Sequence, residues 1–316
     1  MSRPAAVFPG QGSQVVGMGR TLASASPAAR AVFEEVDEAL GERLSRVIFE
    51  GPAELLTATE NAQPALLATS IAAQRALEER LGLPLGAVVC CVAGHSLGEY
   101  SALVAAGSLA LSDAARLLRL RGAAMQRAVP PGAGAMAAIL GLEAAVVVTI
   151  AAEAAGDQVC QLANDNADGQ AVVSGHKEAV ERAVALAKER GAKRAVMLQV
   201  SAPFHCALMA PAAEELAPVL ARTRFAPPAV PLIANVTAEP VRDPELFAEL
   251  LYRQVTGRVR WRESMATMVR MGVDLVLELG PGKVLSGLAK RAMPGVRVLA
   301  LGEAAELDAA AAALVG

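Results

Sequence analysis

A turn with glycines at both ends, Gly94-His95-Ser96-Leu97-Gly98, constrains the fold of this chain more than any other stretch. The small and β-branched residues 87–93 precede it and predict a strand buried on both faces. Residues 99–106 predict a helix that Gly107 ends. A strand-to-helix turn this tight leaves no room for a Cβ atom, which explains the glycines. The whole pattern is that of a nucleophile elbow, which exposes the Ser96 Oγ at the carboxyl end of the strand.

The alternative interpretation is a glycine-rich turn with no chemistry of its own. In the catalytic interpretation, the helix N-terminus faces Ser96 and the amide of Leu97 points to where an oxyanion would form. Such sites take a second oxyanion donor from an early loop. Residues 5–8 predict the first strand, and Gln11 lies in the glycine-rich loop that follows it, so Gln11 is the candidate. The spacing of this loop fits neither a dinucleotide fingerprint nor a P-loop.

Composition narrows the class of protein. The net charge is −3 with no block of like charge, which argues against a nucleic-acid or anionic membrane surface. The four cysteines form neither a disulfide framework nor a metal pattern and suit a reducing compartment. The first residues lack the apolar region and cleavage site of a signal peptide. The apolar stretch 132–156 contains Glu143 and Glu153, which favours a strand and a helix over a membrane span. We therefore expect a soluble, cytoplasmic protein.

An arginine in an apolar stripe is the second informative feature. Residues 27–82 look helical, and a helix over 63–80 makes Gln63 a candidate for a pocket. In the next helix, which Ser112 would cap and which would span 113–127, Arg121 and Met125 fall on the apolar stripe. A buried guanidinium needs an anion. That anion is either a protein carboxylate or a carboxylate of the substrate, which the two-pronged guanidinium would grip.

Residues 134–199 have a rhythm of their own. Strands over 134–140, 158–163, 170–174 and 193–199, with helices over 143–155 and 176–190, give the order β-α-β-β-α-β of a ferredoxin-like domain. The stretch 164–169 is expected to be a turn. We therefore predict a small domain over 128–200, inserted into a large α/β domain made of 1–127 and 201–316.

Only three histidines are available as a general base. His95 precedes the serine on the elbow, where its side chain points away, and His176 opens a polar helix, where we expect it to be exposed. His205 follows a proline at the domain junction, so elimination favours it. Its neighbour Cys206 would be a nucleophile only in a different architecture.

These residues together give the chain a resemblance to a known family. It is similar to the malonyl-CoA:acyl carrier protein transacylases and, more loosely, to acyltransferase domains of fatty-acid and polyketide synthases. The resemblance spans nearly the full length and rests on these motifs: Phe8-Pro9-Gly10-Gln11-Gly12-Ser13-Gln14, Gln63-Pro64-Ala65-Leu66, Gly94–Tyr100, Arg121, Asn164-x-Asn166, Ala202-Pro203-Phe204-His205, Gln254 with Trp261, and Glu278–Leu285.

The resemblance implies an α/β-hydrolase-like large domain, with a mostly parallel sheet, and a ferredoxin-like insert. It makes Ser96 the nucleophile and His205 the base, and it gives Gln254 a carbonyl that orients this base. The amides of Gln11 and Leu97 would form the oxyanion hole. Arg121 would bind the malonyl carboxylate, with the other expected substrate-binding residues being Phe204, Met125, Gln63 and Asn166.

The partners implied are malonyl-CoA, as a substrate and not a resident cofactor, and acyl carrier protein. The chain would act as a monomer without a metal, nucleic acid or membrane. Two rivals stay open: an α/β-hydrolase esterase or thioesterase that uses the same serine, and a subunit that binds carrier protein without turnover.

Overall fold

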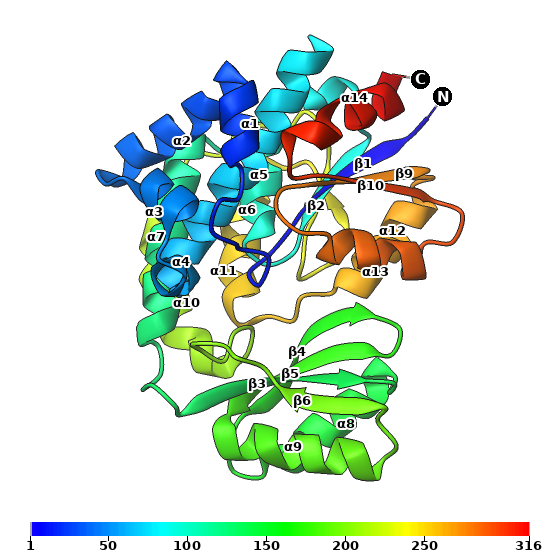
Figure 1. Ribbon diagram of the computed structural model, residues 1–316. Helices are drawn as coiled ribbons and strands as arrows, with labels where there is room; N and C mark the ends of the chain where they lie inside the picture. Colours follow the sequence, from blue (N-terminus) through cyan, green and yellow to red (C-terminus); the bar gives the residue numbers. More distant parts are fainter. Residues whose placement is uncertain (1, 316) are drawn as a thin grey trace.

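The computed structural model describes residues 2–315 of the 316-residue chain. It contains two separate sheets. Figure 1 shows a larger part, in which helices cover both faces of one sheet, and a smaller part in green, in which two helices lie along a second sheet. The second sheet is built from a single internal stretch of the chain, whereas the first collects strands from both ends.

The large sheet has six strands in the order β10-β9-β1-β2-β7-β8. Its four pairs from β10 to β7 are parallel, and only β7 and β8 are antiparallel. The strands are β1 (Pro4–Phe8), β2 (Cys91–Gly94), β7 (Leu232–Ile233), β8 (Pro240–Val241), β9 (Leu275–Leu279) and β10 (Arg297–Leu301). Phe8 is in register with Gly94, so β1 and β2 end side by side. The loop after β1 and the turn after β2 therefore leave the sheet at the same edge.

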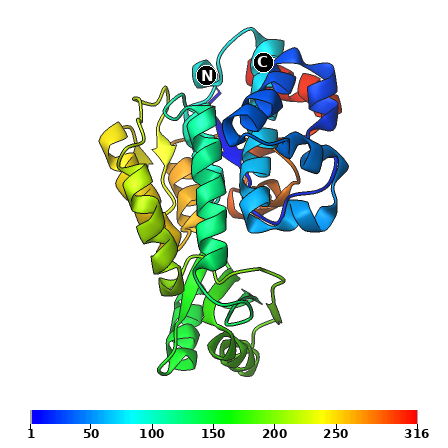
Figure 2. The same cartoon turned by 90° about the vertical axis from the view of Figure 1, so that its left-hand side faces the viewer.

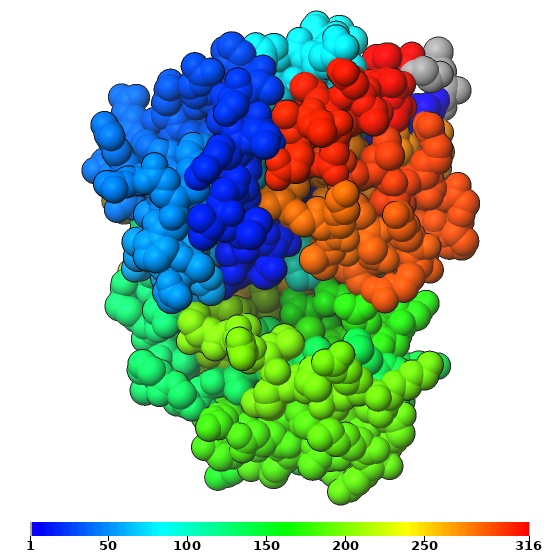
Figure 3. All heavy atoms as spheres, viewed as in Figure 1, coloured from blue at the N-terminus to red at the C-terminus, as the bar shows by residue number. Residues whose placement is uncertain are grey.

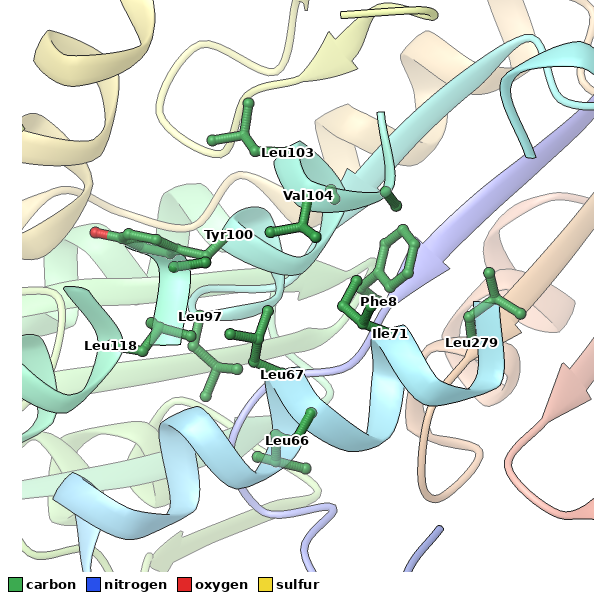
Figure 4. Packing of buried hydrophobic residues seen from close by; sticks show 14 of the residues in the cluster. Phe8, Leu66, Leu67, Ile71, Leu97, Tyr100, Leu103, Val104, Leu118 and Leu279 are labelled. Carbon is green, nitrogen blue, oxygen red and sulfur yellow. The ribbon is translucent and has the colours of Figure 1, made fainter. Parts of the chain in front are cut away.

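Helices cover both faces of this sheet because side chains alternate along β1. Ala6 and Phe8 face a core with α5, α6 and α7, part of which Figure 4 shows, while Ala5 and Val7 face a second core with α12 and α13. The helices of this part are α1 (Arg20–Ala25), α2 (Pro27–Leu40), α3 (Leu44–Glu50), α4 (Ala53–Thr57), α5 (Thr59–Leu81), α6 (Gly98–Ala105), α7 (Leu111–Arg127), α10 (Ala210–Leu220), α11 (Phe247–Thr256), α12 (Trp261–Arg270), α13 (Val284–Ala292) and α14 (Leu307–Val315). Four 3₁₀ turns join them: η1 (Leu85–Ala87), η2 (Ala207–Met209), η3 (Pro244–Leu246) and η4 (Ala304–Glu306).

The small sheet is antiparallel, in the order β4-β5-β3-β6. It consists of β3 (Gly134–Leu140), β4 (Cys160–Ala167), β5 (Gln170–His176) and β6 (Arg194–Met197), with α8 (Ala144–Ala155) and α9 (Lys177–Glu189) packed on one face. On the other face, Met136, Ala163 and Val172 pack against Phe204. Figure 2 shows α7 running from the large part down to this small part, so the two are joined by a helix as well as by loops.

The structure agrees with the expected order of elements but corrects several boundaries. The strand predicted over 87–93 is only Cys91–Gly94, and Leu85–Ala87 form a 3₁₀ turn. The amide of Cys90 donates to the carbonyl of Pro4, the residue at which the neighbouring β1 begins. The residues before Cys90 therefore have no strand to pair with.

Two helix starts also differ. The helix containing Arg121 begins at Leu111 after Ala110, and no side chain caps it, so Ser112 is not its cap. Helix α5 begins at Thr59, four residues before Gln63. Pro64 therefore lies inside the helix, where it leaves the carbonyl of Glu60 without its usual donor.

The predicted turn over 164–169 is the largest correction. Residues 164–167 belong to β4, which has two register shifts against β5. Backbone bonds hold this strand to the large part: the Asp165 amide donates to the Val259 carbonyl, and the Val259 amide donates to the Ala163 carbonyl. Polar residues typical of a turn thus lie in an irregular strand because a partner far along the chain pairs with it. Among residues 2–315, no helix is both long enough and apolar enough to cross a membrane.

Candidate active site

The turn between β2 and α6 has the tight geometry that its glycines predict. A Cβ on Gly94 would lie 1.9 Å from the carbonyl carbon of Gly98, and one on Gly98 would lie 2.3 Å from the carbonyl oxygen of Phe8. Ser96 itself has φ of 53°, in the left-handed region that a non-glycine residue rarely adopts. The turn therefore depends on glycine at both ends and holds Ser96 in a strained conformation.

Asn235, two residues after the end of β7, holds this strained backbone in place. Its Oδ1 accepts a 2.8 Å hydrogen bond from the Ser96 amide, and its Nδ2 donates to the Gly94 carbonyl at 2.6 Å. The side chain is buried. The sequence pattern indicated no role for Asn235; an amide side chain just beyond an apolar strand was the available signal.

His205 lies directly against the serine. Its Nε2 is 2.7 Å from the Ser96 Oγ, and the residue is 3% exposed. Its Nδ1 faces two backbone carbonyl oxygens, that of Gln254 at 3.0 Å and that of Gly257 at 3.1 Å. Both are acceptors, so Nδ1 carries the proton and Nε2 is free to accept the one from Ser96. Burial, together with the charge of Arg121, lowers the pKa of His205 to about 3, which keeps the imidazole neutral.

The side chain of Gln254 has a different task from its carbonyl. Its Oε1 accepts a 2.9 Å hydrogen bond from Arg121, while its Nε2 donates to the Ser96 carbonyl at 2.9 Å and to a carboxylate oxygen of Glu99. The Gln254 carbonyl expected to orient His205 is thus the backbone carbonyl. The backbone carbonyl of Gly257 has the same role. The amide side chain ties the nucleophile to the arginine.

Arg121 occupies the interior of the site and is 2% exposed. Its guanidinium donates to Gln63 Oε1 at 2.8 Å, to Gln254 Oε1 at 2.9 Å and to Ser96 Oγ at 3.2 Å. It lies over the ring of Tyr100, 5.8 Å from the ring centre, and its Nε has no hydrogen-bond partner. No carboxylate of residues 2–315 lies within ion-pair distance of it, so the protein salt bridge that sequence analysis allowed is not formed.

A cavity of about 340 Å³ opens onto these groups between the two parts of the molecule. Most of its lining comes from the loop after β1, from α5 and α7, and from the segment 198–205, which Figure 3 shows meeting the blue N-terminal segments on one face. The lining residues are Gln11, Gly12, Gln14, Thr57, Gln63, His95, Ser96, Arg121, Met136, Asn164, Leu198, Gln199, Val200, Ser201, Phe204 and His205.

The structure thus brings Ser96, His205, Arg121, Gln63 and Phe204 together, as their assignment to one site requires. The Gln11 side chain donates to Thr59 Oγ1 at 3.1 Å, which fixes the early loop beside the pocket. Thr59 in turn bonds Ser201 Oγ at 2.7 Å, so it links this loop to the segment before His205. No sequence pattern had indicated a role for Thr59.

Four of the expected residues lie outside the lining of the pocket: Gln254, described above, the buried Met125 and Leu97, and the half-buried Asn166. The sulfur of Met125 accepts from Gln63 Nε2 at 3.7 Å, so it supports Gln63. Asn166 bonds the Nε2 of His95 at 2.8 Å, and Leu97 is buried at the start of α6.

The other two histidines have structural surroundings. His95 lies edge-on against Trp261, with ring centres 5.6 Å apart, although one edge also reaches the pocket. His176 is half-buried, not exposed as expected, and its Nδ1 accepts from the Val159 amide. Within residues 2–315, no group of three or more histidine, cysteine or acidic side chains is arranged to hold a metal ion.

Comparisons with known proteins find relatives over nearly the whole chain. The family described as "Acyl transferase domain" matches residues 6–316. The chain is 47% identical over 311 residues to the malonyl CoA-acyl carrier protein transacylase of Bacillus subtilis, covering 98% of this chain and 96% of that protein. It is 46% identical to the protein of the same name from Escherichia coli, covering 98% and 99%.

Solved structures agree over the same length. The acyl-carrier-protein-S-malonyltransferase from Bartonella henselae superimposes with a TM-score of 0.96 at 54% identity, covering 99% of both chains. A malonyl-transacylase in complex with a type II polyketide acyl carrier protein gives 0.95 at 44% identity, covering 99% and 100%. The match to the family and these relatives over nearly the whole chain show that it belongs to the acyl transferase family.

Proposed function

We propose that the chain transfers a malonyl group from coenzyme A to the phosphopantetheine thiol of acyl carrier protein, through an acyl-enzyme on Ser96. The observation that carries the proposal is the buried guanidinium of Arg121, which forms no ion pair with any carboxylate of residues 2–315 and lies 3.2 Å from the Ser96 Oγ. An acyl group attached to that oxygen and bearing a free carboxylate would place that carboxylate in direct contact with the guanidinium. The names of the relatives support the same substrate pair.

In the first half-reaction, the neutral His205 removes the proton of Ser96 as its Oγ attacks the thioester carbonyl. The amides of Leu97 and Gln11 are the proposed donors to the oxyanion; the position of Leu97 at the start of α6 supports its part. The protonated His205 then gives its proton to the departing thiolate of coenzyme A. Its positive charge is stabilised by the two carbonyls at Nδ1 instead of by a carboxylate.

In the second half-reaction, the thiol of the carrier protein attacks the malonyl ester, with His205 again as the base. Two backbone carbonyls stabilise an imidazolium less than a carboxylate does, so the site favours a thiol over water as the acyl acceptor. This arrangement disfavours the esterase alternative. Gln63 and Phe204, which line the pocket, would contact the acyl group, while Met125 and Asn166 support the lining from behind.

We propose further that residues 1–127 and 201–316 form one α/β-hydrolase-like catalytic domain and that 128–200 form a ferredoxin-like insert. The strand order β4-β5-β3-β6 and the chain order β-α-β-β-α-β support the insert. We propose that the enzyme acts as a cytoplasmic monomer without a resident cofactor. The four cysteines, which are all free thiols, suit that compartment.

Mass spectrometry of the intact protein after incubation with malonyl-CoA tests the function. The wild type should gain one malonyl unit, Ser96→Ala should gain none, and added carrier protein should remove the unit. Cys206→Ala is the matched control, because this buried thiol adjoins the base, and it should label as the wild type does. A wild type that stays unmodified, or a label on Cys206, would overturn the assignment.

A further inference from the structure

Glu99 is a buried carboxylate that the mechanism above does not use. It lies in the first turn of α6, three residues after the nucleophile, and is 1% exposed. One carboxylate oxygen accepts from Gln254 Nε2, and the other accepts from the Asn235 amide at 3.2 Å. Both neighbours also hold Ser96, because Gln254 donates to its carbonyl and Asn235 accepts from its amide.

Gln254 also links Glu99 to Arg121 through hydrogen bonds. The amide side chain donates to the anion through Nε2 and accepts from the cation through Oε1. The polarised amide of Gln254 lies between the Glu99 carboxylate and the Arg121 guanidinium and stabilises both charges, although the two groups are not in contact. Because Glu99, Gln254 and Arg121 are all buried, the charge of Glu99 is the one that opposes Arg121 when no substrate is bound.

A bound substrate carboxylate would change this balance. Two carboxylates would then share one guanidinium in a buried site, and the second anion disfavours the ionised form of the first. Resting on the proposed function, we propose that Glu99 is the counter-ion of Arg121 in the empty enzyme and takes up a proton from solvent when a carboxylate-bearing acyl group binds. Glu99 is a positioning residue, since it acts through Gln254 and does not touch the reacting atoms.

The surroundings make such a proton exchange possible near neutral pH. Burial raises the pKa of Glu99 to about 7, although Gln254, Asn235 and Arg121 oppose the rise. The other titratable groups around it stay fixed: burial raises the pKa of the adjacent Tyr100 to about 12, and His205 is neutral. Strand β1 has no titratable side chain, β2 has only the buried Cys91, and the buried side chains of α5 are uncharged.

Calorimetry on the Ser96→Ala variant tests the proposal, because this variant binds thioesters without reacting. The heat of binding malonyl-CoA is measured at pH 7.5 in two buffers with different ionisation enthalpies, which counts the protons exchanged. On binding malonyl-CoA, the enzyme should take up roughly half a proton or more beyond what it takes up on binding acetyl-CoA. Acetyl-CoA shares the coenzyme but lacks the carboxylate. The dissociation constant of malonyl-CoA should rise up to about tenfold per pH unit above neutrality.

Adding Glu99→Gln should abolish the excess uptake and flatten this pH dependence. Adding Glu278→Gln is the matched control: Glu278 is an equally buried carboxylate with a raised pKa, but it accepts from amides of α13, and its loss should leave the uptake unchanged. Excess uptake that persists in the Glu99→Gln background would overturn the proposal.

The outcomes also separate this inference from the proposed function. Malonyl-CoA that binds more tightly than acetyl-CoA without excess proton uptake would overturn the role of Glu99 alone. Malonyl-CoA that binds no more tightly than acetyl-CoA would overturn the carboxylate site itself. Infrared difference spectroscopy of the wild type labelled with ¹³C-glutamate tests the same proposal without a substitution at Glu99. A shifted protonated-carboxyl band should appear on malonylation but not on acetylation, and its absence would contradict the proposal.

Discussion

The Nδ1 of His205 lies 3.0 Å from the carbonyl oxygen of Gln254, a backbone atom that no side-chain substitution removes. The side chain of the same glutamine points elsewhere, to Arg121, Glu99 and the Ser96 carbonyl. One residue therefore serves the base with its main chain and the substrate-binding cation with its side chain. Substitutions can separate the two roles.

His205→Ala should lower the rate of malonyl transfer by about 10²–10⁴-fold, the usual contribution of general acid–base catalysis. Gln254→Ala should cost less, because the carbonyl that orients His205 remains. It should also affect malonyl transfer more than acetyl transfer, since it removes an acceptor of Arg121. Steady-state rates with both thioesters measure this difference. Equal rates for His205→Ala and the wild type would place the base elsewhere.

Arg121→Ala should remove most malonyl transfer while keeping or raising acetyl transfer. A charge-assisted hydrogen bond contributes about 1.5–3 kcal/mol, so the preference for malonyl should fall at least about tenfold. Arg119→Ala is the control, because this half-buried arginine of the same helix bonds Asn61 and Glu42 outside the pocket. An Arg121→Ala enzyme that loses both activities equally would show that the arginine is structural.

Phe204 should disfavour a methyl branch on the acyl group. It lines the pocket next to His205 and packs against the small sheet, so it cannot easily move away. We expect malonyl to be preferred over methylmalonyl by a factor of the size that one methyl group gives, about 10–200-fold. Phe204→Ala should lower this preference for malonyl over methylmalonyl. Phe225 lies against Phe247, so Phe225→Ala should leave the preference unchanged. An unchanged ratio in Phe204→Ala would place the acyl α-carbon away from this ring.

The buried imidazole should make stability depend on pH. The pKa of His205 falls from its ordinary value of 6.5 to about 3 on folding, so the unfolded chain binds the proton more readily. Its contribution is therefore present above about pH 6.5 and is lost as the pH falls toward 3, by at most about 1.4 kcal/mol per pH unit. Between pH 7 and 5, urea unfolding of the wild type should lose up to about 2 kcal/mol more than that of His205→Asn. Parallel curves for the two proteins would contradict this prediction.

Local patterns predicted the residues whose roles depend on their own element. Ser96 follows from a strand, a turn and a helix within the 20 residues 87–106, and Arg121 follows from its place on one helical stripe. His205 was reached by elimination among three histidines, which needs no knowledge of its surroundings.

Residues whose roles depend on a distant partner were not predictable in this way. Glu99 looks like an ordinary carboxylate in the first turn of a helix, and only its packing under Gln254 makes it a buried charge. Asn235 looks like the end of a strand until the elbow, 139 residues away, donates to it. Residues 164–166 have the composition of a turn, and the backbone of Val259 overrides that preference.

The bonds between β4 and Val259 have a consequence for protein engineering. Val259 lies two residues after Gly257, whose carbonyl accepts from His205. The buried Asp165, whose amide donates to the Val259 carbonyl, accepts three hydrogen bonds from Arg262. The small part is therefore not an interchangeable cassette, although its sheet is formed from one continuous stretch of chain. A chimaera that takes this part from a relative has to bring the segment 254–262 with it. That segment both pairs with the edge strand β4 and supplies the carbonyls that orient His205.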